Sequence, residues 1–272
     1  LYWSFRSPYS YIAAQRLLEL RERYAFTVDV RIVRPLAVRS PHFFEERDPR
    51  WIHYVLIDVA REAERLGLPI SAPSPDPIVQ DLATLKIAAD QPRIAYLNRL
   101  GVLAAEAGDG LAYIAAASRR IWGGTSAGFN TPWTDDGALD DAASTAGLDA
   151  DWLNAESDAQ SDRIDRQIIE NEANQDAAGH WGVPLMVFEG EPFFGQDRVD
   201  ALLWRMEQRG LQALLRSGFR TSPPQAFPPH RLSAAHAHDL PVLNPELHSA
   251  QFGAGGVIQH QRPASSLAPR GD

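Results

Sequence analysis

The sequence predicts an α/β fold in which a long helical segment interrupts a small sheet domain. Three observations predict it. Residues 1–35 show a strand, a helix and a second strand, residues 36–179 show helical patterns without a convincing strand, and residues 185–208 show a strand hairpin followed by a helix. We therefore expect a sheet domain of residues 1–35 and 180–216, with an inserted all-α domain of residues 36–179.

The first 35 residues carry the clearest local signals. Pro8 suits the first turn of a helix, where no amide donor is needed, and apolar residues follow at helical spacing as far as Arg23. Thr27–Val33 alternates apolar and polar residues, and Arg34-Pro35 ends this strand. A strand, a helix and a second strand in this order predict the start of a parallel unit.

The inserted segment begins with a well-delimited helix. Asp48-Pro49 opens it, and it runs to Leu66 before Gly67. The proline-rich stretch 72–77 is predicted to be a stiff connector. Further helices are expected over residues 79–90, 92–107, 111–122, 136–146 and 157–178. The many acidic residues between Asp135 and Asp176 are interpreted as a solvated helix face.

Strand signals return late in the chain. Leu185–Phe188, a turn at residues 189–191 and residues 192–194 predict a hairpin, which leads to a helix over residues 197–208 capped by Gly210. Residues 217–272 are rich in proline and histidine and lose apolar periodicity. We expect this tail to be disordered and outside the core.

Composition narrows the function classes. The chain has 272 residues, a formal net charge of −9 and no cysteine. The acidic balance argues against a nucleic acid or an anionic membrane as the main partner, and favours a small molecule. Absence of cysteine excludes disulfides and thiolate metal sites within the chain, and a cytoplasmic location is expected from it. No apolar run is long enough for a membrane span.

The segment Ser7-Pro8-Tyr9-Ser10 is the first candidate site. It has the spacing of a Cys-x-x-Cys redox pair, lies between a strand and a helix, and carries hydroxyls in place of sulfurs. At a helix N-terminus, the Ser7 hydroxyl could donate to a ligand thiolate, which the helix dipole also favours. The alternative is that Ser7 only caps the helix.

Two later segments add to this candidate site. Val183-Pro184 opens a strand and is a candidate cis peptide that would turn the backbone of Val183 toward a peptide-like ligand; the alternative is an ordinary trans proline. In Gly195-Gln196-Asp197-Arg198, the Asp197 carboxylate could accept from an ammonium group, and Gln196 offers an amide. The alternative is a helix cap and a surface ion pair.

Three segments together resemble a known family: residues 4–13 (SFRSPYSYIA), 182–187 (GVPLMV) and 193–198 (FFGQDR). They are similar to the 2-hydroxychromene-2-carboxylate isomerase family, in the DsbA-like, kappa-class glutathione transferase branch of the thioredoxin superfamily. The similarity covers residues 1–210. It implies a thioredoxin-like fold with an inserted all-α domain, and a homodimer.

The resemblance also implies a glutathione site between the two domains. Ser7 would face the glutathione sulfur as the catalytic residue, Val183 before cis Pro184 would pair with the cysteinyl backbone, and Gln196 and Asp197 would hold the γ-glutamyl end. The thiolate would add to a small hydrophobic electrophile, so that the chain would be a glutathione-dependent isomerase or transferase.

The sequence departs from the family at two places. The family's usual asparagine and lysine are absent from residues 44–51, where Arg47 or Arg50 could substitute and Glu45 and Glu46 would oppose an anionic substrate. Ser4 stands at a position where the family has an aspartate.

Other functions remain as alternatives. A disulfide oxidoreductase of the DsbA type is disfavoured because the chain has no cysteine. A non-catalytic binder of glutathione or a peptide stays open. His236-Ala237-His238 could hold a metal, but no third ligand stands at fixed spacing, so no metal site is expected.

Overall fold

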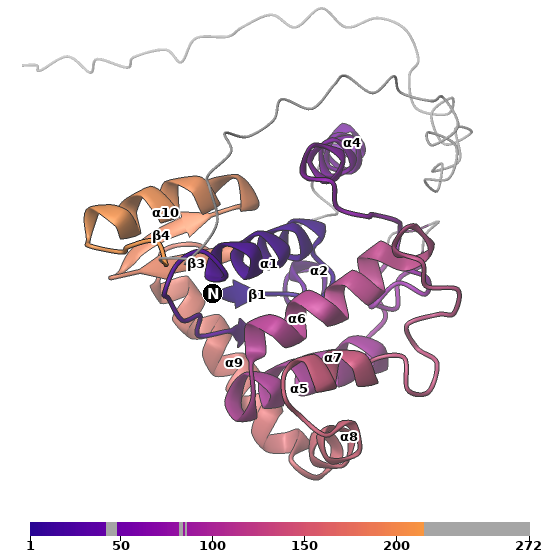
Figure 1. Ribbon diagram of the computed structural model, residues 1–272. Helices are drawn as coiled ribbons and strands as arrows, with labels where there is room; N and C mark the ends of the chain where they lie inside the picture. The colour runs from indigo at the N-terminus through magenta and orange to yellow at the C-terminus, as the bar shows by residue number, and fades with distance from the viewer. Residues whose placement is uncertain (42–47, 82–83, 85, 215–272) are drawn as a thin grey trace, which may run out of the picture. The chain divides into compact units, whose positions relative to one another are not determined.

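The computed structural model describes residues 1–41, 48–81, 84 and 86–214, so that the predicted tail over residues 217–272 lies outside it. Both ends of the described chain join one four-stranded sheet in the order β2-β1-β3-β4 (Figure 1). The strands are β1 (Tyr2–Trp3), β2 (Arg31–Ile32), β3 (Leu185–Phe188) and β4 (Glu191–Phe194). β1 and β2 are parallel, as expected, and β3 is antiparallel to both β1 and β4. The predicted α/β fold with a helical interruption is confirmed.

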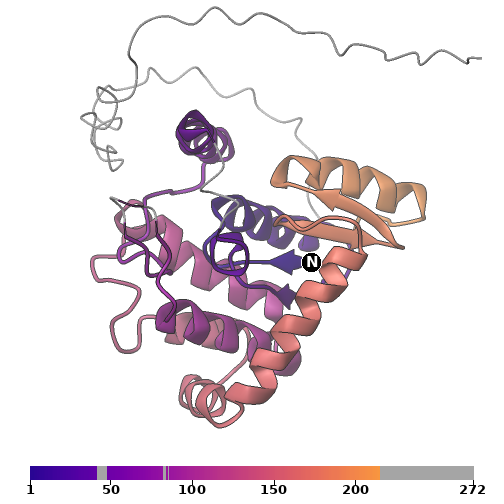
Figure 2. The same ribbon diagram turned by 180° about the vertical axis from the view of Figure 1, so that it is seen from behind.

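The described part of the chain also contains helices, some of which pack on the sheet and others on one another. They are α1 (Pro8–Arg21), α2 (Leu36–Arg39), α4 (Pro49–Leu66), α5 (Pro92–Ala107), α6 (Gly110–Ser118), α7 (Asp140–Thr145), α8 (Ala150–Ala159), α9 (Ser161–Ala177) and α10 (Val199–Gln208), with short helical turns η1 (Arg119–Gly123), η2 (Gly124–Ala127) and η3 (Gln196–Arg198). α10 packs on the hairpin, and α5 and α9 pack on β2; Figure 2 shows α10 along the hairpin and α9 ending at the sheet. No helix in the described part of the chain is long and apolar enough to cross a membrane.

The core joins the sheet to the inserted helices. Trp3 and Phe5 are fully buried, and their rings meet edge to face with centroids 4.6 Å apart. α5 comes very close to them, because a Cβ at Gly101 would lie 2.9 Å from the Phe5 ring and 3.0 Å from the Ile32 side chain. A glycine is therefore needed at this helix crossing, where the inserted segment packs against the first strands.

Several predicted elements have the expected bounds. α4 begins after Asp48, whose carboxylate accepts from the Arg50 N–H, and it ends at Gly67, which has a φ of 64°. The hairpin turns through Glu189 and Gly190, with φ values of 50° and 83°. Two positive φ values in a two-residue loop match the twist of a tight hairpin.

Other predictions were wrong in detail. The strand expected over Thr27–Val33 is reduced to Arg31–Ile32, and the helix expected over residues 157–178 is divided by Gln160 into α8 and α9. The described residues of the stretch 79–90 form no helix. There the Gln91 amide accepts from the Val79 N–H at 2.7 Å and donates to the Val79 carbonyl at 2.9 Å, which holds the stretch as a loop.

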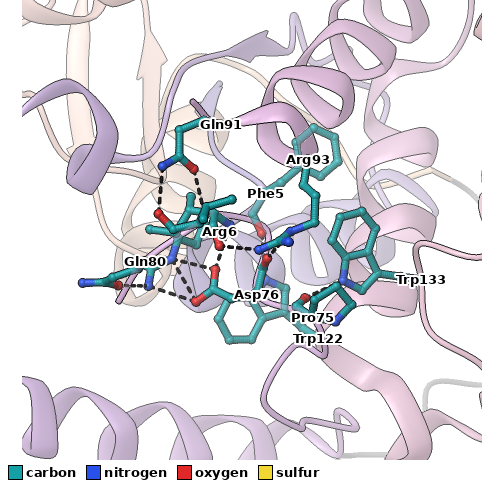
Figure 3. Close-up of polar contacts among 11 residues, drawn as sticks. Phe5, Arg6, Pro75, Asp76, Gln80, Gln91, Arg93, Trp122 and Trp133 are labelled. Atoms are coloured by element: carbon teal, nitrogen blue, oxygen red, sulfur yellow. Dashed lines mark hydrogen bonds and ion pairs between the residues drawn. The ribbon is translucent and has the colours of Figure 1, made fainter. Parts of the chain in front are cut away.

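A polar cluster anchors this loop beside the first helix (Figure 3). We call Arg6, Asp76, Gln80 and Arg93 the connector clasp. The Arg6 guanidinium donates to both carboxylate oxygens of Asp76, at 3.0 Å each, and to Gln80 at 3.0 Å. Arg93 donates to the carbonyls of Asp76 and Ile78, both at 2.8 Å. Because Arg6 directly precedes Ser7, the clasp fixes the backbone that leads into the candidate site.

Two tryptophans reinforce this arrangement. The Trp122 Nε1–H donates to the Phe5 carbonyl at 2.9 Å, and the Trp133 Nε1–H donates to the Pro75 carbonyl at 2.7 Å (Figure 3). The peptide bond between Ser74 and Pro75 is cis, which the sequence analysis did not predict. Residues from the first strand, the connector and η1 thus meet next to the start of α1.

Arg6→Met should lower the free energy of unfolding by about 1 to 2 kcal/mol, because a partly buried guanidinium loses its bidentate pair with Asp76 and its hydrogen bond to Gln80. Chemical denaturation of the full chain measures this. Arg163→Met is the matched control: it also removes a bidentate carboxylate pair, with Glu106, and a hydrogen bond to a glutamine, Gln160. This pair is more exposed, with exposed fractions of 40% and 41%, so its loss should cost about 0.5 kcal/mol or less. Equal small losses in the two variants would contradict the anchoring role of the clasp.

Candidate functional site

Ser7 lies at the N-cap of α1. Its φ of −91° and ψ of 117° are extended, and its Oγ accepts a hydrogen bond from the Ser10 N–H at 3.2 Å. Ser7 therefore caps α1, as the alternative interpretation expected. The Ser7 side chain is only half-buried, and no residue in the described ranges accepts a hydrogen bond from its O–H. The cap uses the acceptor side of the hydroxyl and leaves its proton available to a ligand.

The second hydroxyl of the segment, Ser10, is placed differently. Ser10 is fully buried, and its carbonyl accepts from the Trp3 Nε1–H at 2.8 Å. Its Oγ has no hydrogen-bond partner among the described residues. Of the two positions with Cys-x-x-Cys spacing, only Ser7 can therefore meet a ligand.

The Val183-Pro184 peptide bond is cis, which confirms this part of the sequence prediction. Tyr2 of β1 is paired with Leu185 of β3. In an antiparallel register, two residues further along β1 lie opposite two residues back from Leu185, so that Ser4 is level with Val183. Val183 therefore lies at the end of the sheet where the chain continues from β1 to Ser7. No hydrogen bond to the Val183 N–H or carbonyl occurs within the described residues. These backbone groups can pair with an added strand.

The loop before Val183 is fixed from several sides. The Gln175 amide donates to the Gly182 carbonyl at 2.6 Å, and the Arg39 guanidinium donates to the Trp181 carbonyl. The Gly182 N–H donates to the His180 Nδ1 at 2.8 Å. The His180 ring stacks on Phe194 with centroids 3.8 Å apart, and burial lowers its pKa, so that the neutral ring accepts this bond.

The third segment is joined directly to the second. The Gly195 N–H donates to the Pro184 carbonyl at 2.9 Å, and Gly195 has a φ of 103°, a value that favours glycine. A Cβ there would lie 2.4 Å from the Asp197 carboxylate, which folds back over Gly195. Asp197 is 60% exposed and lies 3.3 Å from the Arg198 guanidinium.

Gln196 faces into the protein. It is 3% exposed, its Oε1 accepts from Arg16 at 3.1 Å, and its Nε2 donates to Glu62 at 2.9 Å. Arg16 also donates to the Gln196 carbonyl. Both ends of the amide are thus bonded within the chain, linking η3 to α1 and α4. Sequence reasoning did not identify Arg16 or Glu62, since neither lies in a motif and both act across long separations.

The surroundings of the α1 N-terminus are acidic. The Tyr9 hydroxyl donates to Asp58 of α4 at 2.8 Å. Burial, the Asp58 hydrogen bond and the charges of Asp58 and Asp197 raise the pKa of Tyr9, so that it keeps its proton at neutral pH. Arg50, a substitute suggested for the missing asparagine or lysine, lies 2.5 Å from Asp48, and the other, Arg47, is outside the described residues, as are Glu45 and Glu46.

The structure therefore brings the three sequence segments together. α1 contacts η3 through Arg16, and η3 is bonded to the cis-proline loop through Gly195. Ser7, Val183 and Asp197 retain polar groups that can reach a ligand, whereas Gln196 has its amide bonded internally. No cluster of metal-ligating side chains occurs within the described ranges, and His236-Ala237-His238 lies outside them.

Comparison with known proteins bears on the fold. No curated protein matches the chain in sequence. The solved structure of a 2-hydroxychromene-2-carboxylate isomerase is similar with a TM-score of 0.55 and 21% identity, over 76% of this chain and 93% of that one. A probable DsbA oxidoreductase from Streptomyces coelicolor matches with a TM-score of 0.48 and 18% identity, over 84% of this chain and 97% of that one. At 21% identity, the similarity to the isomerase structure concerns the fold alone.

The sequence itself assigns the family. Residues 1–207 match the model of the DSBA-like thioredoxin domain. These residues include both ends of the sheet, the segment that starts at Ser7, the cis Pro184 and nearly all of α10. The chain belongs to the DSBA-like thioredoxin domain family.

Proposed function

We propose that this protein is a glutathione-dependent isomerase or transferase that acts on a small hydrophobic electrophile. One observation carries the proposal: the half-buried Ser7 hydroxyl, with its proton available, lies at the same end of the sheet as the unpaired backbone of Val183 before cis Pro184. A hydroxyl and a strand-like backbone edge together suit a cysteine-containing peptide.

The absence of cysteine favours a borrowed thiol. Thiol–disulfide exchange needs an attacking protein thiolate, and this chain has no cysteine at position 7, at position 10 or at any other position. The oxidoreductase alternative therefore has no reactive group here. A serine at the helix start retains the hydrogen-bonding part of the site while the ligand brings the sulfur.

The residues present fit such a ligand. The Ser7 O–H would donate to the sulfur, and the N-terminal end of α1 would stabilise its negative charge. When bound, glutathione supplies a nucleophilic thiolate that can add to an unsaturated carbon and later leave. The chain's own part is to keep the thiol ionised near neutral pH, below its free pKa of about 8.5.

The two other segments would orient the tripeptide. The Val183 N–H and carbonyl would pair with the cysteinyl backbone as an added strand. The exposed Asp197 carboxylate would accept from the γ-glutamyl ammonium. We assign Gln196 to the same end of the site as a residue that holds η3 in place through Arg16 and Glu62, because its amide is already bonded to them.

The charges around Ser7 favour a neutral electrophile over a carboxylate substrate. Asp58 and Asp197 both act on Tyr9, two residues from Ser7, and Arg50 is paired with Asp48. The Asp58 and Asp197 carboxylates would repel an anionic substrate. Arg50 would not offset this repulsion, because it is paired with Asp48. We therefore propose conjugation or isomerisation of an uncharged α,β-unsaturated compound.

Calorimetric titration of the full chain with glutathione, followed by conjugation and isomerisation assays on uncharged enones, tests the proposed function. Saturable binding together with turnover is expected. Binding without turnover of any electrophile would instead indicate a non-catalytic binder, and absence of binding would contradict the glutathione site itself.

Ser7→Ala should raise the pKa of the bound glutathione thiol toward its free value of about 8.5, because the donor to the sulfur is lost. The ultraviolet absorbance of the thiolate, followed against pH, measures this. Ser10→Ala is the matched control, since the buried Ser10 Oγ faces no partner in the described chain, and its thiolate titration should stay unchanged. A Ser7→Ala titration identical to wild type would remove Ser7 from the thiolate site.

Asp197→Ala should weaken glutathione binding by about 1 to 3 kcal/mol, as expected for loss of a charged hydrogen bond. Calorimetry measures the affinity. Arg198→Ala provides the control: it breaks the ion pair of 3.3 Å but keeps the carboxylate, so affinity should stay the same or rise. Equal affinity in wild type and Asp197→Ala would show that this carboxylate does not contact the ligand.

A further inference from the structure

A cavity in the helical segment is separate from the site around Ser7. It has a volume of about 650 Å³ and is lined by residues of α5, α6, α7, α8 and the loop 133–139, and neither Ser7, Val183 nor Asp197 lines it. A volume of this size is in the range of small-molecule sites. Nothing in the proposed glutathione chemistry uses it.

Aromatic side chains form part of its wall. Tyr113 is fully buried, yet its hydroxyl has no hydrogen-bond partner among the described residues. Tyr96 is 38% exposed, and its hydroxyl donates to Asn154, another wall residue, at 2.6 Å. A buried hydroxyl without a partner is costly unless a ligand or water satisfies it, so Tyr113 points to an occupant.

The same wall is strongly acidic. Five exposed acidic residues line the cavity, and none of them forms a salt bridge within the described part of the chain: Asp135, Asp136, Asp140, Asp151 and Asp158. Arg93 is the cation on the wall, and it donates to the carbonyls of Asp76 and Ile78 in the connector clasp. Two of its N–H groups are thus taken up by backbone carbonyls.

The charge is focused on Tyr96. Burial raises the pKa of Tyr96 most, and the charges of Asp140, Asp158 and Asp136 raise it further. These carboxylates are spread over the wall: no group of three acidic or histidine side chains within the described residues is close enough to hold a metal ion. Dispersed negative charge around an exposed aromatic ring suits a cation larger than a metal ion, with an apolar body.

We propose that this cavity binds an organic ammonium ion with an aromatic or apolar body. The ammonium group would donate one N–H to the Tyr113 hydroxyl, and the negative charges of Asp136, Asp140 and Asp158 on the surrounding wall would attract it without all three carboxylates contacting it. The apolar body would pack against the Tyr96 ring. The carboxylates supply the charge preference, and the rings exclude water from the apolar part.

Calorimetric titration of the full chain with phenethylamine at neutral pH tests this, with 2-phenylethanol as a neutral probe of nearly the same shape and magnesium chloride as a small cation. Phenethylamine should bind at least about tenfold more tightly than 2-phenylethanol, because only the ammonium uses the carboxylates. Magnesium should not displace it. Equal affinity of amine and alcohol, displacement by magnesium, or no binding of the amine would overturn the proposal.

Two variants locate the site. Tyr113→Phe should weaken phenethylamine binding about tenfold, while the ligand-free variant should be as stable as wild type or more so, because an unpartnered buried hydroxyl is removed. Asp140→Asn with Asp158→Asn should weaken binding by a similar factor. Glu170→Gln, which removes one charge from an exposed position of α9, is the control and should bind as wild type. Unchanged binding in the first two variants would contradict this location.

Discussion

The pairing of Tyr2 with Leu185 is the contact on which the site depends, because it joins two chain ends separated by the whole helical segment. It places the start of α1 and the cis Val183-Pro184 bond at the same end of the sheet. The hydrogen bond from the Gly195 N–H to the Pro184 carbonyl then adds the third segment. A site made from residues so far apart in sequence exists only when the sheet is closed in this register.

Side chains of the surrounding helices and loops hold these segments in place. Arg6 and Asp76 fix the approach to Ser7 from one side. Arg16 and Glu62 hold Gln196, and Gln175 holds the loop before Val183. Such supporting contacts determine how accurately donors are placed, and the helical segment thereby contributes to the site without supplying its reactive groups.

Local signals in the sequence were sufficient for much of this. Proline at a helix start, Gly67 at a helix end and the three short segments predicted α1, α4, the cis proline and the hairpin. The helix expected over residues 79–90 was wrong because the Gln91 side chain bonds to the backbone of Val79 and holds a loop. The bonds of Gln196 to Arg16 and Glu62 were likewise not predicted, since they join residues far apart in sequence. The acidic residues from Asp135 onward were interpreted as a solvated face, and those that line the cavity with Tyr113 are indeed exposed; the cavity beside them was not predicted. Periodicity does not indicate which side chains a distant helix will cover.

We propose that the reactive sulfur belongs to a bound tripeptide that lies between the Ser7 hydroxyl and the Val183 backbone. A crystal structure of the full chain with glutathione tests this most directly. The account predicts the sulfur within hydrogen-bonding distance of the Ser7 Oγ, and the cysteinyl N–H and carbonyl paired with Val183. Glutathione bound elsewhere, or bound here with its sulfur turned away from Ser7, would contradict it.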